Sequence, residues 1–188
     1  MPLPPAESRA LIAQGARRAA AGRPNRQEVI ETLRRLGSEA ETLVALFDAR
    51  AIAGERHLLS AWAHLGRARG RGETRLRDRS AEFALYVAGD DQLPRALQKV
   101  GVSDSSDQFV VVVERPRSLA ETTRAFQLID DPSAFPRAAD EATLDRLGIS
   151  EEDRREVPRS GWEGLVLERV ALIELSAAHA GAKPTQKA

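Results

Sequence analysis

The sequence predicts one domain in which α-helices accompany a few short β-strands. Its 188 residues are enough for a single domain with a proper core, and we find neither an internal repeat nor a second domain. Residues 42–47 and 109–113 are short, apolar and rich in β-branched or aromatic side chains, which is typical of buried strands. Elsewhere, apolar residues recur at helical spacing behind residues that cap helices.

The first clear helix is expected to begin at Asn25. Asn25 can cap it, Glu28 completes a capping box three residues later, and Gly37 is expected to end the helix. Upstream, residues 1–24 are weakly patterned, and helix propensity alone would make residues 6–21 helical.

The middle of the chain predicts three further helices. The first opens at His57, since apolar residues follow at spacing i, i+3, i+4 and i+7 from Leu58, and it should end before a loop at residues 66–73. Residues 81–88 are apolar except for Glu82 and are expected to form a central buried helix. Two acids, Asp90 and Asp91, can cap the helix that follows and ends at Val100.

Helices are also expected after the strand at residues 109–113. Ser118 and Glu121 predict a capping box for a helix that ends near residue 129. Two short helices should follow, ending at Gly148 and near residue 156. Residues 165–175 are apolar enough to be a helix, or a helix that runs into a strand.

Composition excludes several classes of protein and site. The chain has no cysteine, so it holds no disulfide, thiolate metal site or cysteine nucleophile, which fits a cytoplasmic protein. It lacks the long apolar run of a membrane span, and its N-terminus does not resemble a signal peptide. Lys+Arg equals Asp+Glu at 28 each, so binding to a polyanion must depend on a local patch.

The arginine segment, residues 67–79, is the one polar feature above background. It contains six arginines and two acids, a net charge of +4, at Arg67, Arg69, Arg71, Glu73, Arg75, Arg77, Asp78 and Arg79. One interpretation is a solvated loop and helix start; the other is a patch for a nucleic-acid backbone. Aromatic residues make up only 4% of the chain, so a short single-stranded end is a better ligand than a long stacked strand.

No residue set predicts catalysis. His57 and His64 are two helix turns apart, roughly 10 Å, too far to share a metal, and are expected to be surface or half-buried structural residues. Gly70-Arg71-Gly72 is a poor match to a phosphate-binding loop, because no strand leads into it. Acidic pairs such as Asp90-Asp91 stand where turns and caps favour acids.

Several motifs, taken in order, resemble one protein family. They are His57-Leu58-Leu59-Ser60-Ala61, a basic loop, Glu82 in an apolar helix, Gly89 before Gln92-Leu93, and Val100-Gly101. Leu46-Phe47-Asp48-Ala49 and residues 167–175 add to the likeness. Together they resemble the kinase-binding small subunit of the KEOPS (EKC) complex, the TPRKB-like family, from about Leu11 onward.

The resemblance implies a mixed α/β (α+β) fold, a small sheet covered by several helices, with residues 11–14 as its first strand. It implies a non-catalytic regulatory subunit that binds and stimulates the complex's atypical kinase, an ATPase, and captures the single-stranded 3′ CCA end of tRNA. The complex makes threonylcarbamoyladenosine in tRNA, and another subunit performs the transfer. No cofactor, metal, membrane or small-molecule substrate is implied.

From the arginine segment and the resemblance we expect six nucleic-acid-binding residues: Arg67, Arg71, Arg75, Arg77, Gln92 and Arg95. The family usually has an arginine directly before the glutamine of its Gly-x-Arg-Gln-Ile pattern, but this chain has Asp91. A contact made by that arginine is therefore either missing here or supplied elsewhere, and Arg95 is the candidate to supply it. We expect the domain at residues 9–178, with a disordered tail at residues 1–8 and a flexible one at 179–188. Two alternatives stay open: a kinase-regulating interaction module that does not bind RNA, and a small enzyme that binds a phosphorylated substrate through the arginines.

Overall fold

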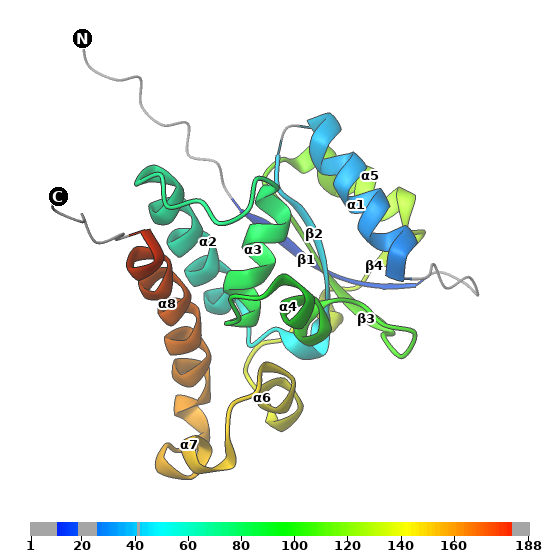
Figure 1. Cartoon of the computed structure of the whole chain (residues 1–188). Coiled ribbons are helices and arrows are strands. Elements are labelled where there is room, and N and C mark those ends of the chain that lie inside the picture. The colour runs from blue at the N-terminus through cyan, green and yellow to red at the C-terminus, as the bar shows by residue number, and fades with distance from the viewer. Residues whose placement is uncertain (1–10, 19–25, 41, 182–188) are drawn as a thin grey trace, which may run out of the picture.

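The architecture is known from a computed structural model that describes residues 11–18, 26–40 and 42–181 (Figure 1). The expected cap Asn25 and the expected tail at residues 1–8 lie outside the described residues, as do residues 182–188. No helix in the described part of the chain is both long and apolar enough to cross a membrane.

One four-stranded antiparallel sheet forms the centre, in the order β2-β3-β1-β4. Its strands are β1 (Ile12–Arg18), β2 (Val44–Asp48), β3 (Gln108–Val113) and β4 (Leu128–Asp130). The valines of β3 are buried on both faces of the sheet, which explains why that strand does not alternate apolar and polar residues. The expected strands at residues 42–47 and 109–113 are therefore confirmed, with β2 starting two residues late.

Helices cover both faces of the sheet (Figure 1). The α-helices of the described residues are α1 (Arg26–Ala40), α2 (Glu55–Gly70), α3 (Arg79–Ala88), α4 (Leu93–Val100), α5 (Pro116–Ala125), α6 (Glu141–Leu147), α7 (Glu151–Glu156) and α8 (Trp162–Gly181). Short 3-10 turns occupy Ala49–Ala51, Pro132–Ala134 and Arg159–Gly161. Helices α1 and α5 pack on one face and α2, α3, α4 and α8 lie on the other, so the predicted α+β fold is confirmed.

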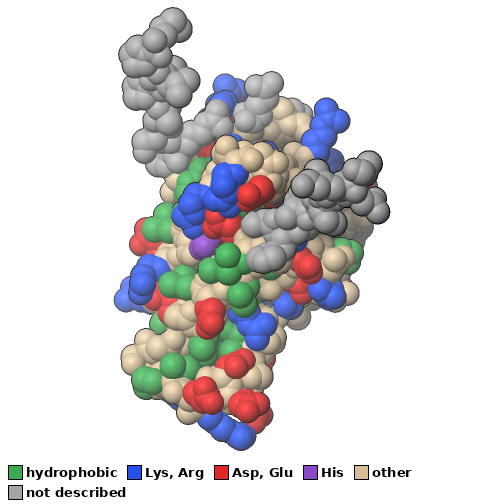
Figure 2. Space-filling view, turned by 60° about the vertical axis from the view of Figure 1, so that its left-hand side comes forward, with side chains coloured by type: hydrophobic (Ala, Val, Ile, Leu, Met, Phe, Trp, Pro, Cys, Tyr) green, Lys and Arg blue, Asp and Glu red, His purple; other side chains and the backbone are tan. Residues whose placement is uncertain are grey.

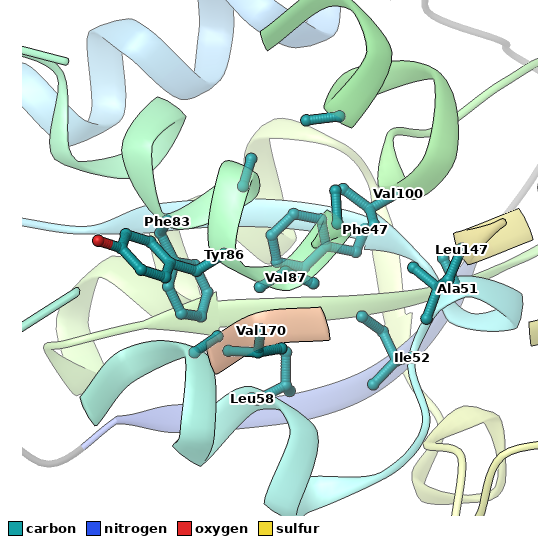
Figure 3. Packing of buried hydrophobic residues seen from close by; sticks show 14 of the residues in the cluster. Phe47, Ala51, Ile52, Leu58, Phe83, Tyr86, Val87, Val100, Leu147 and Val170 are labelled. Atoms are coloured by element: carbon teal, nitrogen blue, oxygen red, sulfur yellow. The ribbon is translucent and has the colours of Figure 1, made fainter. Parts of the chain in front are cut away.

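The larger core lies between the sheet and helix α3. Residues 82–88 of α3 are all buried, which confirms the predicted central helix. Phe83 contacts Phe47 of the sheet and Trp62 of α2, with ring centroids 6.0 and 6.4 Å apart. Figure 3 shows Tyr86 and Val87 beside them, with Val170 of α8 closing the cluster. Because α3 packs against α2, α4 and α8, it organises this side of the molecule.

The N-terminal segment follows the family resemblance rather than propensity. Within the described residues 11–18, the helix that propensity predicts over residues 6–21 is wrong, because β1 (Ile12–Arg18) pairs with both β3 and β4. Pairing with two strands outweighs an intrinsic preference worth a few tenths of a kcal/mol per residue. Gly37 does not end α1, which continues to Ala40, although the Gly37 carbonyl accepts a hydrogen bond from the Thr42 N–H.

Three other boundaries differ from the sequence predictions. Helix α2 continues through most of the expected loop at residues 66–73, since Gly66 and Gly70 are tolerated in it. Helix α5 begins at Pro116 without a capping box and ends at Ala125, because residues 128–130 form the edge strand β4. The apolar run at residues 165–175 is helical throughout, as part of α8 (Trp162–Gly181).

One expected helix cap and one histidine also need correction. Gln92, not Asp90 or Asp91, is the N-cap residue of α4; Asp90 accepts the Gln92 N–H and so shapes the turn before it. His57 is fully buried rather than surface or half-buried. Its Nδ1 accepts from the Ala53 N–H at 3.2 Å and its Nε2 donates to the Val87 carbonyl at 2.9 Å, which joins α2 to α3.

We predict that His57 makes folding stability depend on pH. Burial lowers its pKa from 6.5 to about 4, although the hydrogen bond to Val87 opposes this shift. Below pH 6.5 the unfolded chain binds a proton that the folded chain does not, so the free energy of unfolding falls as the pH decreases. The loss should approach about 3 kcal/mol near pH 4.

The measurement is urea unfolding of wild type and His57→Gln at several pH values in this window. The difference in the free energy of unfolding between wild type and the variant should shrink as the pH falls. Taking this difference at each pH cancels the contribution of other titrating groups. A difference that stays constant would contradict the prediction.

Candidate functional site

The arginine segment binds a buried carboxylate on α3. Glu82, the one charged residue in the apolar part of this helix, is fully buried. Its Oε2 accepts from Arg69 Nε at 2.7 Å, and its Oε1 accepts from the backbone N–H of Arg75 at 2.8 Å. Arg69 also donates to the Leu76 carbonyl at 3.0 Å. Glu82 therefore fixes the loop between α2 and α3 to the core.

A second buried carboxylate binds the last arginine of the segment. Glu114 follows β3, and its Oε2 accepts from Thr42 Oγ1 at 2.9 Å and from the Leu43 N–H at 2.8 Å. Its Oε1 lies 2.8 Å from Arg79 Nη2, and the Arg79 guanidinium also lies 4.8 Å from the centre of the Trp62 ring. Arg79 thus links the start of α3 to the sheet.

A third carboxylate, Glu174 of α8, binds two arginines. Arg67 Nη2 lies 3.0 Å and Arg71 Nη2 2.6 Å from its oxygens, and His64 Nδ1 contacts the same group. Burial raises the pKa of Glu174, but hydrogen bonds from Arg67, Arg71 and His64 outweigh it and lower the pKa to about 2. Figure 2 shows basic and acidic side chains gathered around a histidine at this place. Glu174 is therefore a permanent anion that neutralises this part of the segment.

Only Arg77 of the segment is left pointing outward with no ion pair or side-chain hydrogen bond among the described residues. Arg75 Nη2 donates to Ser176 Oγ at 2.7 Å and to the Ile173 carbonyl at 3.2 Å, so it secures α8. Counting Glu82, Glu114 and Glu174 with the segment lowers its net charge from +4 to +1. Five of the six arginines therefore have partners within the fold, although Arg67 and Arg71 stay half-exposed.

Gln92 and Arg95 lie at the other predicted position, the start of α4. Both side chains are exposed, and Arg95 pairs with Asp90 at 3.0 Å and with Asp91 at 3.1 Å. Burial raises the pKa of Asp90, but hydrogen bonds from Gln92, Lys99 and Arg95 outweigh it, so the pKa lies below its ordinary value. Arg95 is thus held by Asp90 and by Asp91, which stands where the resemblance expects an arginine.

An apolar groove opens at the edge of the sheet beside Arg77. Its floor is strand β2 and its walls are α1 on one side and α3 with α4 on the other; the wall side chains include Ile30, Leu33, Ala84, Leu93 and Leu97. A polar hollow lined by Arg69, Arg77, Arg79, Thr42 and Ser38 adjoins it, and Asp78 and Ser80 line both. The apolar groove thus continues into a polar hollow that contains three arginines and Asp78.

The free edge of β2 faces into this groove. The antiparallel register directs the backbone N–H groups of Val44 and Leu46 away from β3. The Val44 N–H donates to Ser80 Oγ at 3.0 Å. The groove therefore offers backbone hydrogen-bonding groups at its floor as well as apolar walls.

The described residues contain one fully buried histidine and no candidate metal site. No group of three or more His, Cys, Asp or Glu side chains in them is placed to hold a metal ion. His57, the histidine nearest the core, is kept neutral by burial and uses both ring nitrogens for backbone hydrogen bonds. The arrangement offers apolar surfaces and arginines for contact with a binding partner. The acids are the counter-ions of the arginines.

Comparison with known families identifies the chain. A family model described as "Kinase binding protein CGI-121" matches residues 24–172, most of the protein. The chain belongs to the CGI-121 family. It is thus a member of a family of kinase-binding proteins, and the resemblance recognised from the sequence motifs is confirmed. A comparison with curated proteins finds none that matches.

The CGI-121 motifs acquire a structural explanation. His57 and Glu82 are buried anchors of α2 and α3 rather than exposed contacts. Gly89 ends α3 with φ 57°, and a Cβ there would lie 2.8 Å from Arg169 Cβ, so only glycine allows the close approach to α8. Sequence reasoning missed Glu114 and Glu174, whose only signal was the excess of six arginines over the two acids Glu73 and Asp78 within the segment.

We predict that the Arg69–Glu82 pair is structural and strongly coupled. Arg69→Met should destabilise the fold by about 3–5 kcal/mol, because it leaves the buried Glu82 carboxylate without its cation. Chemical unfolding measures this. The matched control is Arg67→Met, whose half-exposed guanidinium pairs with Glu174, and its expected cost is below about 1 kcal/mol.

The double variant Arg69→Met, Glu82→Met should recover most of the lost stability, since apolar side chains of similar size can replace a buried pair. Equal, small effects of Arg69→Met and Arg67→Met would contradict the structural role of Arg69.

Proposed function

We propose that this CGI-121 protein is the non-catalytic regulatory subunit of a KEOPS complex. In this role it binds and stimulates the atypical kinase/ATPase subunit and recruits tRNA by its 3′ CCA end for threonylcarbamoyladenosine modification, in the cytoplasm. The supporting observation is membership of a kinase-binding family by a chain whose described residues contain apolar surfaces and arginines but no catalytic arrangement.

The apolar groove, with the exposed Arg77 in the polar hollow beside it, fits a short single-stranded RNA end. Arg77 is exposed and can contact a phosphate, and the apolar walls can hold a base against β2. Gln92 directly precedes Leu93, a residue of the groove wall. The two predicted positions, at Arg77 and at Gln92, therefore both lie beside this groove.

The six proposed RNA contacts then fall into two groups. Arg77 lines the polar hollow beside the groove, Gln92 directly precedes the wall residue Leu93, and both side chains are exposed. Arg67, Arg71, Arg75 and Arg95 are tied to protein partners, so phosphate contacts from them must share or displace those partners. We therefore expect Arg77 to contribute most and Arg75, which secures α8, to contribute least.

A kinase regulator that does not bind RNA is the second candidate. The observation that favours it is the use of five of the six arginines of the segment by internal partners. In that case wild type would form the kinase complex but would not distinguish intact tRNA from tRNA without its CCA end.

We predict a one-to-one complex with the kinase subunit of the same organism and an increased ATPase rate of that kinase. Size-exclusion chromatography with light scattering measures the first, and phosphate release measures the second. The protein alone should hydrolyse no ATP and transfer no threonylcarbamoyl group. The absence of both co-elution and a change in the ATPase rate would refute this function. Turnover by the isolated protein would refute it too.

We predict that Arg77→Glu weakens tRNA binding and reduces its salt dependence. About three phosphate contacts to a single strand give a log-log salt slope of roughly −2, and loss of one contact flattens it by about 0.7. The control is Arg117→Glu, a highly exposed arginine on α5 away from the groove. Titrations use intact tRNA and tRNA lacking CCA, with and without the kinase.

The effects of Arg77→Glu and of CCA removal should not add, because both changes remove the same contact. If Arg77→Glu and Arg117→Glu bind intact tRNA with the affinity and slope of wild type, the RNA site is elsewhere.

A further inference from the structure

The apolar packing of helix α8 ends at Ile173. Val166, Val170 and Ile173 belong to the larger core, whereas the next three side chains, residues 174–176, are half-buried or exposed and lie outside it. Two of these three, Glu174 and Ser176, contact arginines of the arginine segment instead. Beyond Ile173, α8 is therefore joined to the molecule by polar contacts that water or another anion can replace.

Glu174 uses the edge of each arginine that is best suited to phosphate. Arg67 directs both Nε and Nη2 at Glu174 Oε2, at 3.3 and 3.0 Å. Arg71 divides its corresponding edge between Glu174, 2.6 Å from Nη2, and Glu73, 2.9 Å from Nε. Arginine binds phosphate through two such neighbouring N–H groups. A phosphate that binds either arginine in this way must therefore take the place of a carboxylate.

The two arginines are open to solvent, while the carboxylate between them is largely covered. The side chains of Arg67 and Arg71 are 50% and 44% exposed, and that of Glu174 is 12% exposed. With Glu73, the two cations and two anions sum to zero charge. A phosphodiester carries one negative charge, so it can replace Glu174 without changing the charge of this cluster.

The contacts of Glu174 differ from those of the structural carboxylate Glu82. Glu82 is fully buried and accepts from the backbone N–H of Arg75, so its loss would release the loop before α3. In the described part of the chain, the hydrogen bonds to Glu174 come from side chains alone. Ion pairs between half-exposed groups are weak. Glu174 can therefore leave its arginines without unfolding the segment.

We propose that Glu174 is an internal competitor of the RNA backbone. In the free protein it occupies the phosphate-binding edges of Arg67 and Arg71, and a phosphate of single-stranded RNA must displace it to reach them. This role rests on the proposed RNA function and adds its regulation. An RNA whose end also binds in the apolar groove has further contacts that offset the displacement of Glu174, whereas a polyanion held by charge alone has none. Glu174 thus lowers nonspecific binding.

The test compares tRNA binding by wild type, Glu174→Gln and Glu168→Gln. Both substitutions remove one negative charge from α8, but Glu168 is exposed and pairs with no arginine among the described residues. Glu174→Gln should bind tRNA about fivefold more tightly, with a log-log salt slope steeper by about 0.7 for each arginine released. Glu168→Gln should stay within about twofold of wild type. Equal affinities and slopes for the two variants would overturn the proposal.

A double-mutant cycle assigns the gain to the two arginines. Arg67→Met with Arg71→Met should change the tRNA affinity of wild type by less than about twofold, because Glu174 already occupies both groups. The same two substitutions in the Glu174→Gln protein should remove its whole gain. A gain that persists without Arg67 and Arg71 would contradict the competitor role.

Thermal unfolding by circular dichroism shows whether Glu174→Gln keeps the fold. The amide is nearly the same size as the carboxylate and still accepts hydrogen bonds, so the melting temperature should stay close to that of wild type. If this variant does not fold, Glu174→Asp replaces it, since a side chain shorter by one methylene keeps the charge but contacts the arginines less closely. Its tRNA affinity should also rise, and an unchanged affinity would overturn the proposal.

Heparin chromatography separates failure of the proposal from failure of the RNA function. If neither wild type nor Glu174→Gln binds tRNA, the RNA function is refuted. Elution of Glu174→Gln from heparin at a higher salt concentration than Glu168→Gln would then still support Glu174 as a competitor of polyanions. Elution of the two variants at the same salt concentration would overturn that role as well.

Discussion

The ion pair between Arg69 and Glu82 is the constraint on which one side of this molecule depends. Glu82 is in the most buried helix of the fold, where an ionised carboxylate is stable only with a cation and further hydrogen bonds. Those partners come from the end of α2 and from the loop before α3. The loop is therefore ordered by the core, and its neighbouring arginines are directed toward α8 and the sheet, where Glu174, Ser176 and Glu114 receive them.

Local signals in the sequence were sufficient for much of the fold. The capping and apolar patterns predicted α3, the strand at residues 109–113 and the short helices ending near Gly148 and residue 156. They failed where long-range pairing decides the conformation: β1 has helix-favouring alanines and arginines, yet two neighbouring strands hold it extended. The β4 strand, only three residues long, carries no pattern of its own.

The candidate site was harder to predict for a related reason. Six arginines in 13 residues indicate a basic patch only if their counter-ions are ignored, and Glu114 and Glu174 are distant in the sequence. The family motifs indicated a kinase as the binding partner. They did not show that His57 and Glu82 are buried residues that join α2 to α3. Conversely, Arg77, one of six equivalent arginines in the sequence, is distinguished only by the positions of the other five.

Strand β2 shows how an open groove can coexist with an exposed sheet edge. An unpaired apolar strand at the edge of a sheet is a template for pairing with another chain, and proteins usually shield such edges. Here α1 and the α3–α4 pair rise on either side of β2, and Ser80 Oγ already accepts the Val44 N–H. These walls hinder the approach of a flat strand from another sheet. The helices that form the groove thereby also shield the edge of β2 from edge-to-edge aggregation.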